Sequence, residues 1–258
     1  MGNKVTYILS ITVLLAVIFS NFGRESTSDP DVKVGVSDDM SGFVLDYMIK
    51  TNPVSQDYEA YFIKDCCAKT SQWALTSDFL DMSIMCVSAA KMFVENNSSF
   101  IIFSPVTMNT DVFVINGDTP TLVGMTQNRA YQKELIKGKF GEGAEVIPMV
   151  NQALPYALEK NEVQAAVIDI TKAMQLGSDI IPANINGDYV SYVLVVNKEF
   201  SKTDVFEEFV GAFNNATATL QEDQSVYTRH LSEYIGDVNI EEGVYKNWKV
   251  KLLFIEES

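Results

Sequence analysis

The sequence is short of the residues on which much enzymatic chemistry depends. It holds one histidine, His230, and three cysteines among 258 residues. The histidine lies in YTRHLSEYIG (227–236), a segment typical of a peripheral helix, so we interpret it as a surface residue. The sequence therefore offers few residues for catalysis by a histidine base or for a metal site built from several histidines. A CxxC redox motif is also missing.

Positive charge is scarce as well. Nineteen lysines and arginines stand against 34 aspartates and glutamates, which gives a formal net charge of −15. Such a surface repels phosphate backbones, so we expect no nucleic-acid partner. We interpret the excess of acidic residues as serving solubility alone.

One long apolar run is present, and it lies at the N-terminus. Lys4 precedes VTYILSITVLLAVIF (5–19), and the polar stretch NFGRESTSDPD (21–31) follows. This order is typical of an export signal. No good cleavage site follows the run, and the lack of a cysteine after it excludes a bacterial lipoprotein anchor. We predict that residues 1–30 are either a signal peptide or a retained membrane-anchor helix with a polar tether, and that the folded part is extracytoplasmic.

From residue 32 onward, short β runs alternate with stretches of helical length. The β runs of the first series are 32–37, 58–65, 82–85 and 99–106, with helices at 43–51, 70–80 and 88–96. The second series has β runs at 121–126, 144–150 and 165–170, with helices at 128–141, 152–162 and 171–177. A β run at 189–197 and an amphipathic helix at 204–223 follow. The pattern predicts an α/β fold with mostly parallel sheets.

We predict two lobes that are joined by two crossings of the chain, near 107–113 and 190–197. The first lobe would hold residues 31–108 and 197–258, and the second lobe residues 109–196. Ligands of open parallel sheets bind outside the carboxyl ends of the strands. The sequence therefore predicts a ligand cleft between the lobes, which can close by a hinge motion.

Cysteines follow two of the predicted strands of the first lobe. Cys66 and Cys67 come after the second strand, Cys86 after the third, and Asp39 and Ser41 after the first. Parallel strands would bring all five to one edge, where we predict ligand contacts. Thiolates select soft partners, so the three cysteines are candidate ligands of a thiophilic metal or organometal. The alternatives are a buried Cys86, a disulfide, or a redox-sensitive pair without a ligand. We expect no resident cofactor.

The second lobe offers strand-to-helix turns that face this edge. Thr126 and Asn128 are suited to cap the helix at 128–141, whose first amides would hold an anionic group. Tyr131, and Arg129 beside it, would reach the cleft. Asp169 stands at the start of the next helix in the same arrangement. Plain helix capping is the alternative for these residues.

Four stretches carry a resemblance to a known family. They are VKVGVSDDMSGF (32–43), LTSDFLDMSIM (75–85), TLVGMTQNRAYQKELIKGKFG (121–141) and EKNEVQAAVIDIT (159–171). Their order resembles the substrate-binding proteins of ABC importers, in the nitrate-, sulfonate- and thiamine-precursor-type branch of the type 2 periplasmic-binding fold. The resemblance covers nearly all of residues 31–225. It implies a bacterial, non-enzymatic binder of a small ligand, with an ABC permease and ATPase as partners.

The cysteine pair also resembles a small bacterial subfamily of these binders, in which a selenocysteine or cysteine occurs. Because most family members use polar or aromatic residues there, the pair argues against an oxyanion or amine ligand. Two other functions stay open. One is a thiol-based redox or metal sensor ectodomain that is tethered by the N-terminal helix. The other is a cysteine-dependent enzyme on the same fold, although the cysteine-rich iron motif of the enzyme family with this fold is missing.

Overall fold

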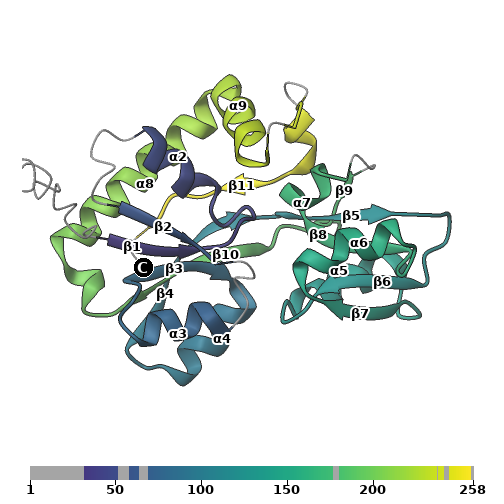
Figure 1. The fold of residues 1–258 in the computed structure, drawn as a ribbon, viewed down its shortest axis with the longest axis horizontal. Coiled ribbons are helices and arrows are strands. Elements are labelled where there is room, and N and C mark those ends of the chain that lie inside the picture. The colour runs from purple at the N-terminus through teal and green to yellow at the C-terminus, as the bar shows by residue number, and fades with distance from the viewer. Residues whose placement is uncertain are drawn as a thin grey trace, which may run out of the picture. The chain divides into compact units, whose positions relative to one another are not determined.

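The computed structural model describes residues 32–51, 58–63, 69–176, 180–236, 238–240 and 244–256. The apolar run at 5–19 and the cysteine pair at 66–67 lie outside these ranges. Among the described helices, none combines the length and the hydropathy that a membrane crossing requires. Residues from Val32 onward form one unit with two β-sheets (Figure 1).

The first sheet has six strands in the order β11-β4-β10-β3-β1-β2. Its strands are β1 (Val32–Val36), β2 (Tyr58–Phe62), β3 (Met82–Cys86), β4 (Phe100–Met108), β10 (Val190–Asn197) and β11 (Lys251–Leu252). The pairs of β1 with β2 and with β3 are parallel, as the alternating pattern predicts. β10 pairs antiparallel with β3 and with β4, so the sheet is mixed. The reason is that β10 enters from the second sheet and inserts between two strands of the first.

The second sheet has five strands in the order β7-β6-β8-β5-β9. They are β5 (Asp111–Ile115), β6 (Leu122–Thr126), β7 (Glu145–Met149), β8 (Ala165–Asp169) and β9 (Ile180–Pro182). β6 is parallel to β7 and β8, whereas β5 is antiparallel to β8 and β9. In both sheets, a parallel strand leads to an aspartate at its carboxyl end: β1 to Asp39 and β8 to Asp169.

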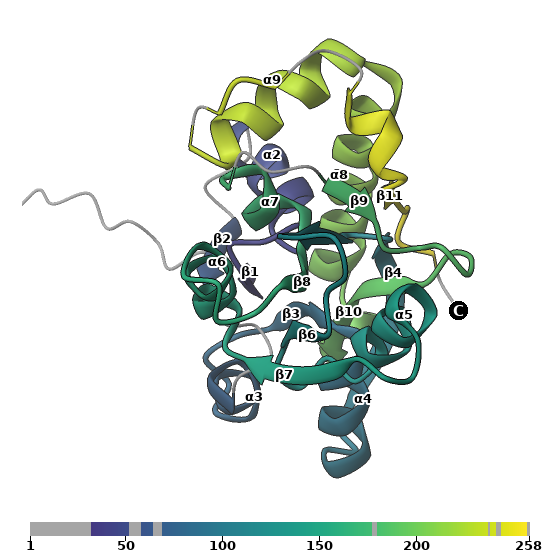
Figure 2. The ribbon, with the colours of Figure 1, turned by 90° about the vertical axis from the view of Figure 1, so that its right-hand side faces the viewer.

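Helices cover both faces of the first sheet. Figures 1 and 2 show α3 (Lys69–Thr76) and α4 (Val87–Asn96) on one face, and three helices on the other. These three are α2 (Phe43–Thr51), α8 (Asp204–Glu222) and α9 (Gln224–Tyr234). The side chain of Thr203 caps α8, and Phe206, Phe209 and Phe213 are buried along one side of it. Their spacing is the helical one that the sequence predicts.

The second sheet carries α5 (Tyr131–Phe140), α6 (Leu154–Glu159) and α7 (Ile170–Met174), together with the short turn η2 (Asn151–Ala153). Alternate residues of β5 face opposite ways, as strand geometry requires. Phe113 packs in the cluster of apolar side chains that includes α5, and Val112 and Val114 pack in the cluster that includes α6. The turns η3 (Phe200–Lys202) and η4 (Val244–Trp248) lie outside both sheets.

The interpretation of His230 as a surface residue is wrong. It lies on α9 and is buried, because α9 packs against α2. Its Nε2 atom lies 3.1 Å from the carbonyl oxygen of Phe43, and its ring contacts the rings of Phe43 and Tyr47. Burial lowers the pKa of His230, which favours the neutral imidazole as a packed core residue.

Candidate functional site

Two crossings of the chain join the sheets, and hydrogen bonds tie the crossings to each other. Asn109, between β4 and β5, has a positive φ of 59°. Its side-chain oxygen accepts a hydrogen bond of 3.0 Å from the amide of Tyr189, just before β10. Its side-chain nitrogen donates to Asp188 and to the carbonyl of Lys249. The amide of Thr110 donates to Ser191 at 3.0 Å. These bonds hold the two crossings, before β5 and at the start of β10, side by side where the sheets meet.

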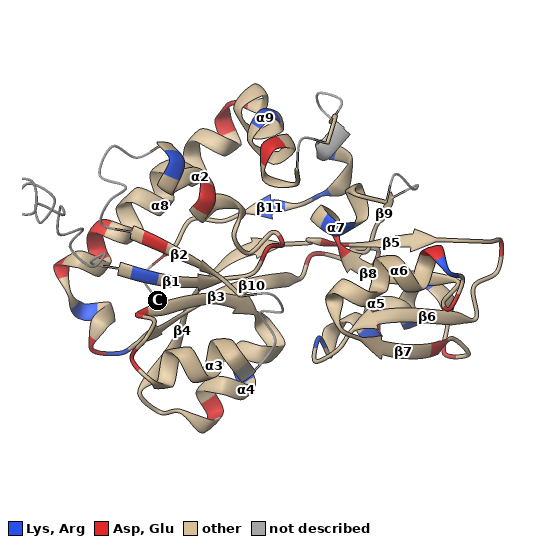
Figure 3. Ribbon diagram, in the orientation of Figure 1, with Lys and Arg blue, Asp and Glu red and all other residues tan. Residues whose placement is uncertain are grey.

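Three aspartates gather at this meeting point. Asp39 follows β1, Asp111 begins β5, and Asp169 ends β8. Asp111 and Asp169 are cross-strand partners in the antiparallel pair of β5 and β8. All three side chains are fully buried. Figure 3 shows acidic segments on the ribbon between the two sheets. Because buried carboxylates require partners, the contacts of these three define the site.

Arg129 inserts its guanidinium among these carboxylates. Its Nη2 atom lies 2.9 Å from Oδ2 of Asp39, and its Nη1 atom lies 3.4 Å from Oδ1 of Asp111. The guanidinium carbon stands 5.2 Å from the centre of the Tyr192 ring, and Nη2 also donates to the Tyr192 hydroxyl at 2.9 Å. Asp39 and Tyr192 belong to the first sheet's part of the chain, and Arg129 and Asp111 to the second's. The buried ion pair of Arg129 with Asp39 therefore joins the part of the chain that holds the first sheet to the part that holds the second.

Asp111 is also bound by neutral groups of the second sheet's part. Gln132 donates to its Oδ1 at 2.7 Å, and the Tyr131 hydroxyl donates to its Oδ2 at 2.8 Å. The Tyr189 hydroxyl lies 3.4 Å from the same Oδ2. Burial and the Asp111 charge raise the pKa values of Tyr131 and Tyr189, so both hydroxyls keep their protons as donors.

Asp169 is held by hydrogen bonds, and no ion pair to it occurs in the described part of the chain. Its Oδ1 accepts from the amide and the hydroxyl of Thr171, at 3.0 and 2.8 Å, and from the amide of Met40 at 3.3 Å. Its Oδ2 accepts from the Tyr192 hydroxyl at 2.9 Å. Burial, followed by repulsion from Asp39, raises the pKa of Asp169 to about 7.

A second ion pair joins the two parts at the edge of the cluster. Lys172, in α7, lies 2.8 Å from Oδ2 of Asp38, next to Asp39. The loop after β1 is fixed by Ser41, whose hydroxyl accepts from the Ser37 amide and whose own amide donates to Asp39. The Tyr234 hydroxyl donates to the carbonyl of Asp39 at 2.7 Å. The predicted residues Asp39, Ser41, Tyr131 and Asp169 are thus brought to one place.

Thr126 and Asn128 do not cap the following helix as predicted. α5 begins later, at Tyr131, and its N-cap position is Ala130, which makes no side-chain cap. Thr126 is the buried last residue of β6 and bonds Asn151 at 3.3 Å. Asn128 is exposed, with a φ of 65°. The left-handed turn at Asn128 replaces a regular helix start, and the next side chain, Arg129, is fully buried.

Cys86 alone among the predicted thiol ligands lies within the described residues. It ends β3, precedes α4 and is fully buried, as both the ligand and the core interpretations allow. Its cross-strand partner is Tyr192, so it lies beside the cluster. Cys66 and Cys67 fall outside the described ranges. Within those ranges, no group of three or more histidine, cysteine or acidic side chains is arranged to hold a metal.

Three partners in the cluster escaped the sequence predictions: Asp111, Gln132 and Tyr192. Asp111 had a usable signal, because a single carboxylate directly before the apolar VFVI run is unusual for a buried strand. Tyr192, inside SYVLVV, has the appearance of an ordinary strand residue. Gln132 is one polar residue among many on its helix. Its two buried bonds, to Asp111 and from the amide of Thr126, join it to residues that the fold brings close.

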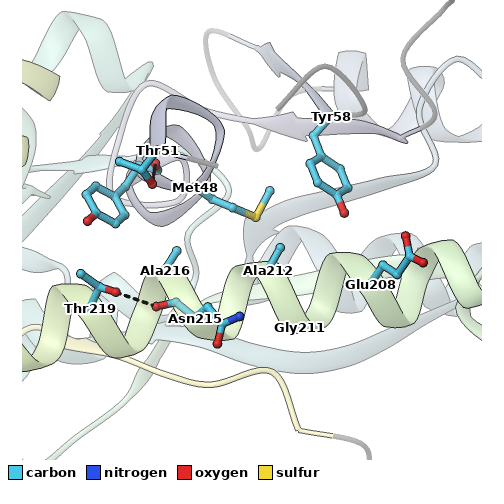
Figure 4. A pocket seen from close by; sticks show the side chains of 10 residues that line it. Met48, Thr51, Tyr58, Glu208, Gly211, Ala212, Asn215, Ala216 and Thr219 are labelled. Carbon is cyan, nitrogen blue, oxygen red and sulfur yellow. Dashed lines mark hydrogen bonds between the residues drawn. The ribbon is translucent and has the colours of Figure 1, made fainter. Parts of the chain in front are cut away.

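Two cavities are relevant to a binding site. The larger, of about 630 Å³, is a groove between α2 and α8 that includes Met48, Tyr58 and Glu208 (Figure 4). It lies away from the carboxylate cluster. The smaller, of about 260 Å³, adjoins the cluster through Asp38 and Tyr234. Asp46, Lys50, Phe62 and Glu233 complete its walls.

Comparison with known proteins gives matches in structure only. No family model matches the sequence, and no curated protein matches it. A ligand-binding component of an ABC-type import system from Staphylococcus aureus, solved with zinc bound, has a TM-score of 0.68 at 13% identity, over 87% of this chain and 85% of that one. An ABC transporter structure from Parabacteroides distasonis has a TM-score of 0.68 at 13% identity, over 87% of this chain and 86% of that one.

The alkanesulfonate-binding protein SsuA from Xanthomonas axonopodis pv. citri, bound to MOPS, gives a TM-score of 0.60 at 11% identity, over 80% of this chain and 79% of that one. Identities this low show a shared fold. The chain therefore has the α/β periplasmic-binding fold that its resemblance to importer binding proteins implies. The branch of the family and the cysteine or selenocysteine subfamily stay predictions.

Proposed function

We propose that this chain is the extracytoplasmic solute-binding component of an ABC-type importer. It captures a small solute where its two sheets meet and passes it, unchanged, to a permease with its ATPase. The observation that supports this most is the set of buried contacts between the two parts, on a fold shared with such binders. Arg129 pairs with Asp39 and Asp111, and Asp169 accepts hydrogen bonds from Met40 and Tyr192. The same fold argues for binding without catalysis, because its matches are described as binding components.

The mechanism is closure. Each sheet contributes its own half of the cluster, so contacts between the halves form only when the parts approach. A solute favours the closed state by as much as its contacts differ between the open and closed states. The ion pair of Lys172 with Asp38 and the bond from Met40 to Asp169 join the same two halves, and closure makes all of them together.

A thermal screen of the full chain in mild detergent tests the binding function. The panel holds alkanesulfonates, methionine, Zn²⁺ and other small solutes. We expect one class to raise the melting temperature with saturating, one-to-one behaviour, because a ligand of the folded state alone stabilises it by mass action. The solute should be recovered unchanged after denaturation. Chemical conversion of the solute would contradict the proposal.

The thiol hypothesis belongs to the same function. We propose that Cys66, Cys67 and Cys86 contribute soft ligands to the solute. The first two come after β2 in the sequence and Cys86 ends β3, and both strands pair with β1, which leads to Asp39. Native mass spectrometry of the full chain, purified anaerobically and offered Hg(II), Cu(I), phenylmercury or arsenite, tests it. Wild type should form a one-to-one adduct with a higher melting temperature, and the variant Cys66→Ser/Cys67→Ser should not.

Equal adducts in both proteins, or none in either, would remove the cysteine pair from the site. The variant Cys86→Ser is the matched control for the buried thiol. If it alone abolishes the adduct, Cys86 is the ligand and the adjacent pair has another role.

A further inference from the structure

On the basis of the proposed binding function, we infer that the solute carries a cationic nitrogen group, a guanidinium or an ammonium. In the structure, the guanidinium of Arg129 lies in the place that this group would take. Arg129 is then an internal competitor that holds the two parts together until the solute replaces it. A solute of this kind is an alternative to the thiophilic solute proposed for the cysteines, because guanidinium and ammonium groups are bound by carboxylates and aromatic rings. It also departs from the sequence-based argument against an amine ligand.

The surroundings of Arg129 are those that recognise a planar cation. Carboxylate oxygens of Asp39 and Asp111 approach its nitrogens to 2.9 and 3.4 Å, and the Tyr192 ring lies 5.2 Å from its central carbon. Carboxylates at the nitrogens and an aromatic ring within about 6 Å are the usual contacts for guanidinium and ammonium groups. The Tyr192 hydroxyl adds a hydrogen bond of 2.9 Å from Nη2. We call this set of three side chains the cation cradle.

The proposed exchange requires the side chain of Arg129 to leave the cation cradle. It belongs to the turn before α5, and its neighbours Asn128 and Ala130 are both exposed. We expect Arg129 to leave by a change of its own rotamers, because it lies in this turn and not in a strand. A solute cation would then inherit the bonds to Asp39 and Asp111, so that neither buried carboxylate loses its counter-charge.

The remaining charges at the cluster disfavour an anionic solute. Asp169 is buried beside the cation cradle and forms no ion pair with a described residue. Repulsion from Asp39 is one cause of the raised pKa of Asp169. A further negative charge at the cluster is therefore unfavourable. An anion that drew Arg129 away would leave three carboxylates together in a desolvated site.

The adjoining cavity has the same character. The rings of Phe62 and Tyr234 line it together with three carboxylates. Two of these carboxylates already pair with a lysine, Asp38 with Lys172 and Asp46 with Lys50, and the third belongs to Glu233. Phe62 is 47% exposed, although it is a large apolar side chain. The two rings suit an alkyl chain of the solute, and Glu233 is the carboxylate that a second cationic group would meet. The net charge of −15 additionally speeds the approach of cations.

Thermal denaturation of the full chain in detergent tests the inference with defined probes at millimolar concentration and equal ionic strength. Agmatine carries a guanidinium and an ammonium, methylguanidine has the guanidinium alone, and ethanesulfonate is the anionic counterpart. We expect agmatine to raise the melting temperature by roughly 5–10 °C at about 100 times its dissociation constant. Methylguanidine should give a smaller rise, and ethanesulfonate none.

Variants locate the effect. Asp39→Asn should abolish the agmatine shift, while Asp118→Asn, in an exposed turn, should keep it. Arg129→Lys keeps a positive charge but loses the planar fork, so its competition weakens and agmatine should bind several-fold tighter. If Asp39→Asn is unfolded, the Arg129→Lys comparison still decides, because a cation that binds elsewhere would show no change in affinity.

Other outcomes separate the inference from the proposed function. A shift with ethanesulfonate but not agmatine would overturn the cationic solute and leave the binding function standing. An agmatine shift that is equal in wild type and in the Asp39→Asn and Arg129→Lys variants would reflect general attraction to an acidic protein, and would also overturn the inference. No shift with any probe would do the same, and the wider solute screen would then judge the binding function by itself.

Discussion

Replacing Arg129 with alanine is expected to lower the free energy of unfolding by about 3–5 kcal/mol, because it leaves buried carboxylates without their cation. The guanidinium touches Asp39, Asp111 and Tyr192, and its side chain is 1% exposed. Denaturation in urea, followed by circular dichroism, measures the change. In a protein of this size, the melting temperature should fall by about 2–4 °C for each kcal/mol.

The matched control is Arg229→Ala, since Arg229 is exposed on α9. A surface change of this kind should stay within about 0.5 kcal/mol. The double variant Arg129→Gln/Asp39→Asn should lose less stability than the sum of its single variants, because the two residues share one interaction. A loss below about 1 kcal/mol for Arg129→Ala would show that the ion pair adds little to the folded state.

Asp169 is expected to make stability depend on pH in the neutral range. Its pKa rises from 3.8 in a free side chain to about 7 in the folded protein, so the folded state binds the proton more tightly than the unfolded chain. The resulting stabilisation is complete below about pH 4 and is lost as the pH rises through about 7. The shift corresponds to about 4 kcal/mol.

The variant Asp169→Asn isolates this contribution, because its amide resembles the protonated carboxyl and does not titrate. Wild type should lose up to about 4 kcal/mol of stability relative to the variant between pH 4 and pH 8. Asp118→Asn, in an exposed turn, should have the same pH profile as wild type. Parallel profiles for wild type and Asp169→Asn would mean that Asp169 stays ionised in the folded protein.

The elements that the sequence predicted well are those with strong local signals. The helix predicted at 43–51 coincides with α2, and the helix predicted at 204–223 ends one residue later than α8. Their apolar residues recur at helical spacing and their ends carry polar residues. The strands β9 and β11 were not predicted, because two or three residues hold too little periodicity to distinguish a strand from a loop.

Strand direction was the main error in the fold. The regular alternation of β runs and helices favours parallel pairs, but β5 and β10 are strands by which the chain passes between sheets. Their antiparallel pairing depends on the sheet that the chain enters after each crossing. The local sequence pattern holds no information about that path. The same limit applies to the site. Asp39 and Asp169 were found because one follows a strand and the other ends one. The contact of Arg129 with Asp39, in contrast, joins residues that are 90 positions apart.

A solute that binds where the two sheets meet is expected to draw both parts of the chain together. Hydrogen–deuterium exchange of the full chain tests it, with and without the solute that the thermal screen selects. Exchange should slow together in segments 37–45, 126–136 and 166–174, which hold the two halves of the cluster. Protection of one half alone, or of the groove between α2 and α8, would contradict binding where the two sheets meet.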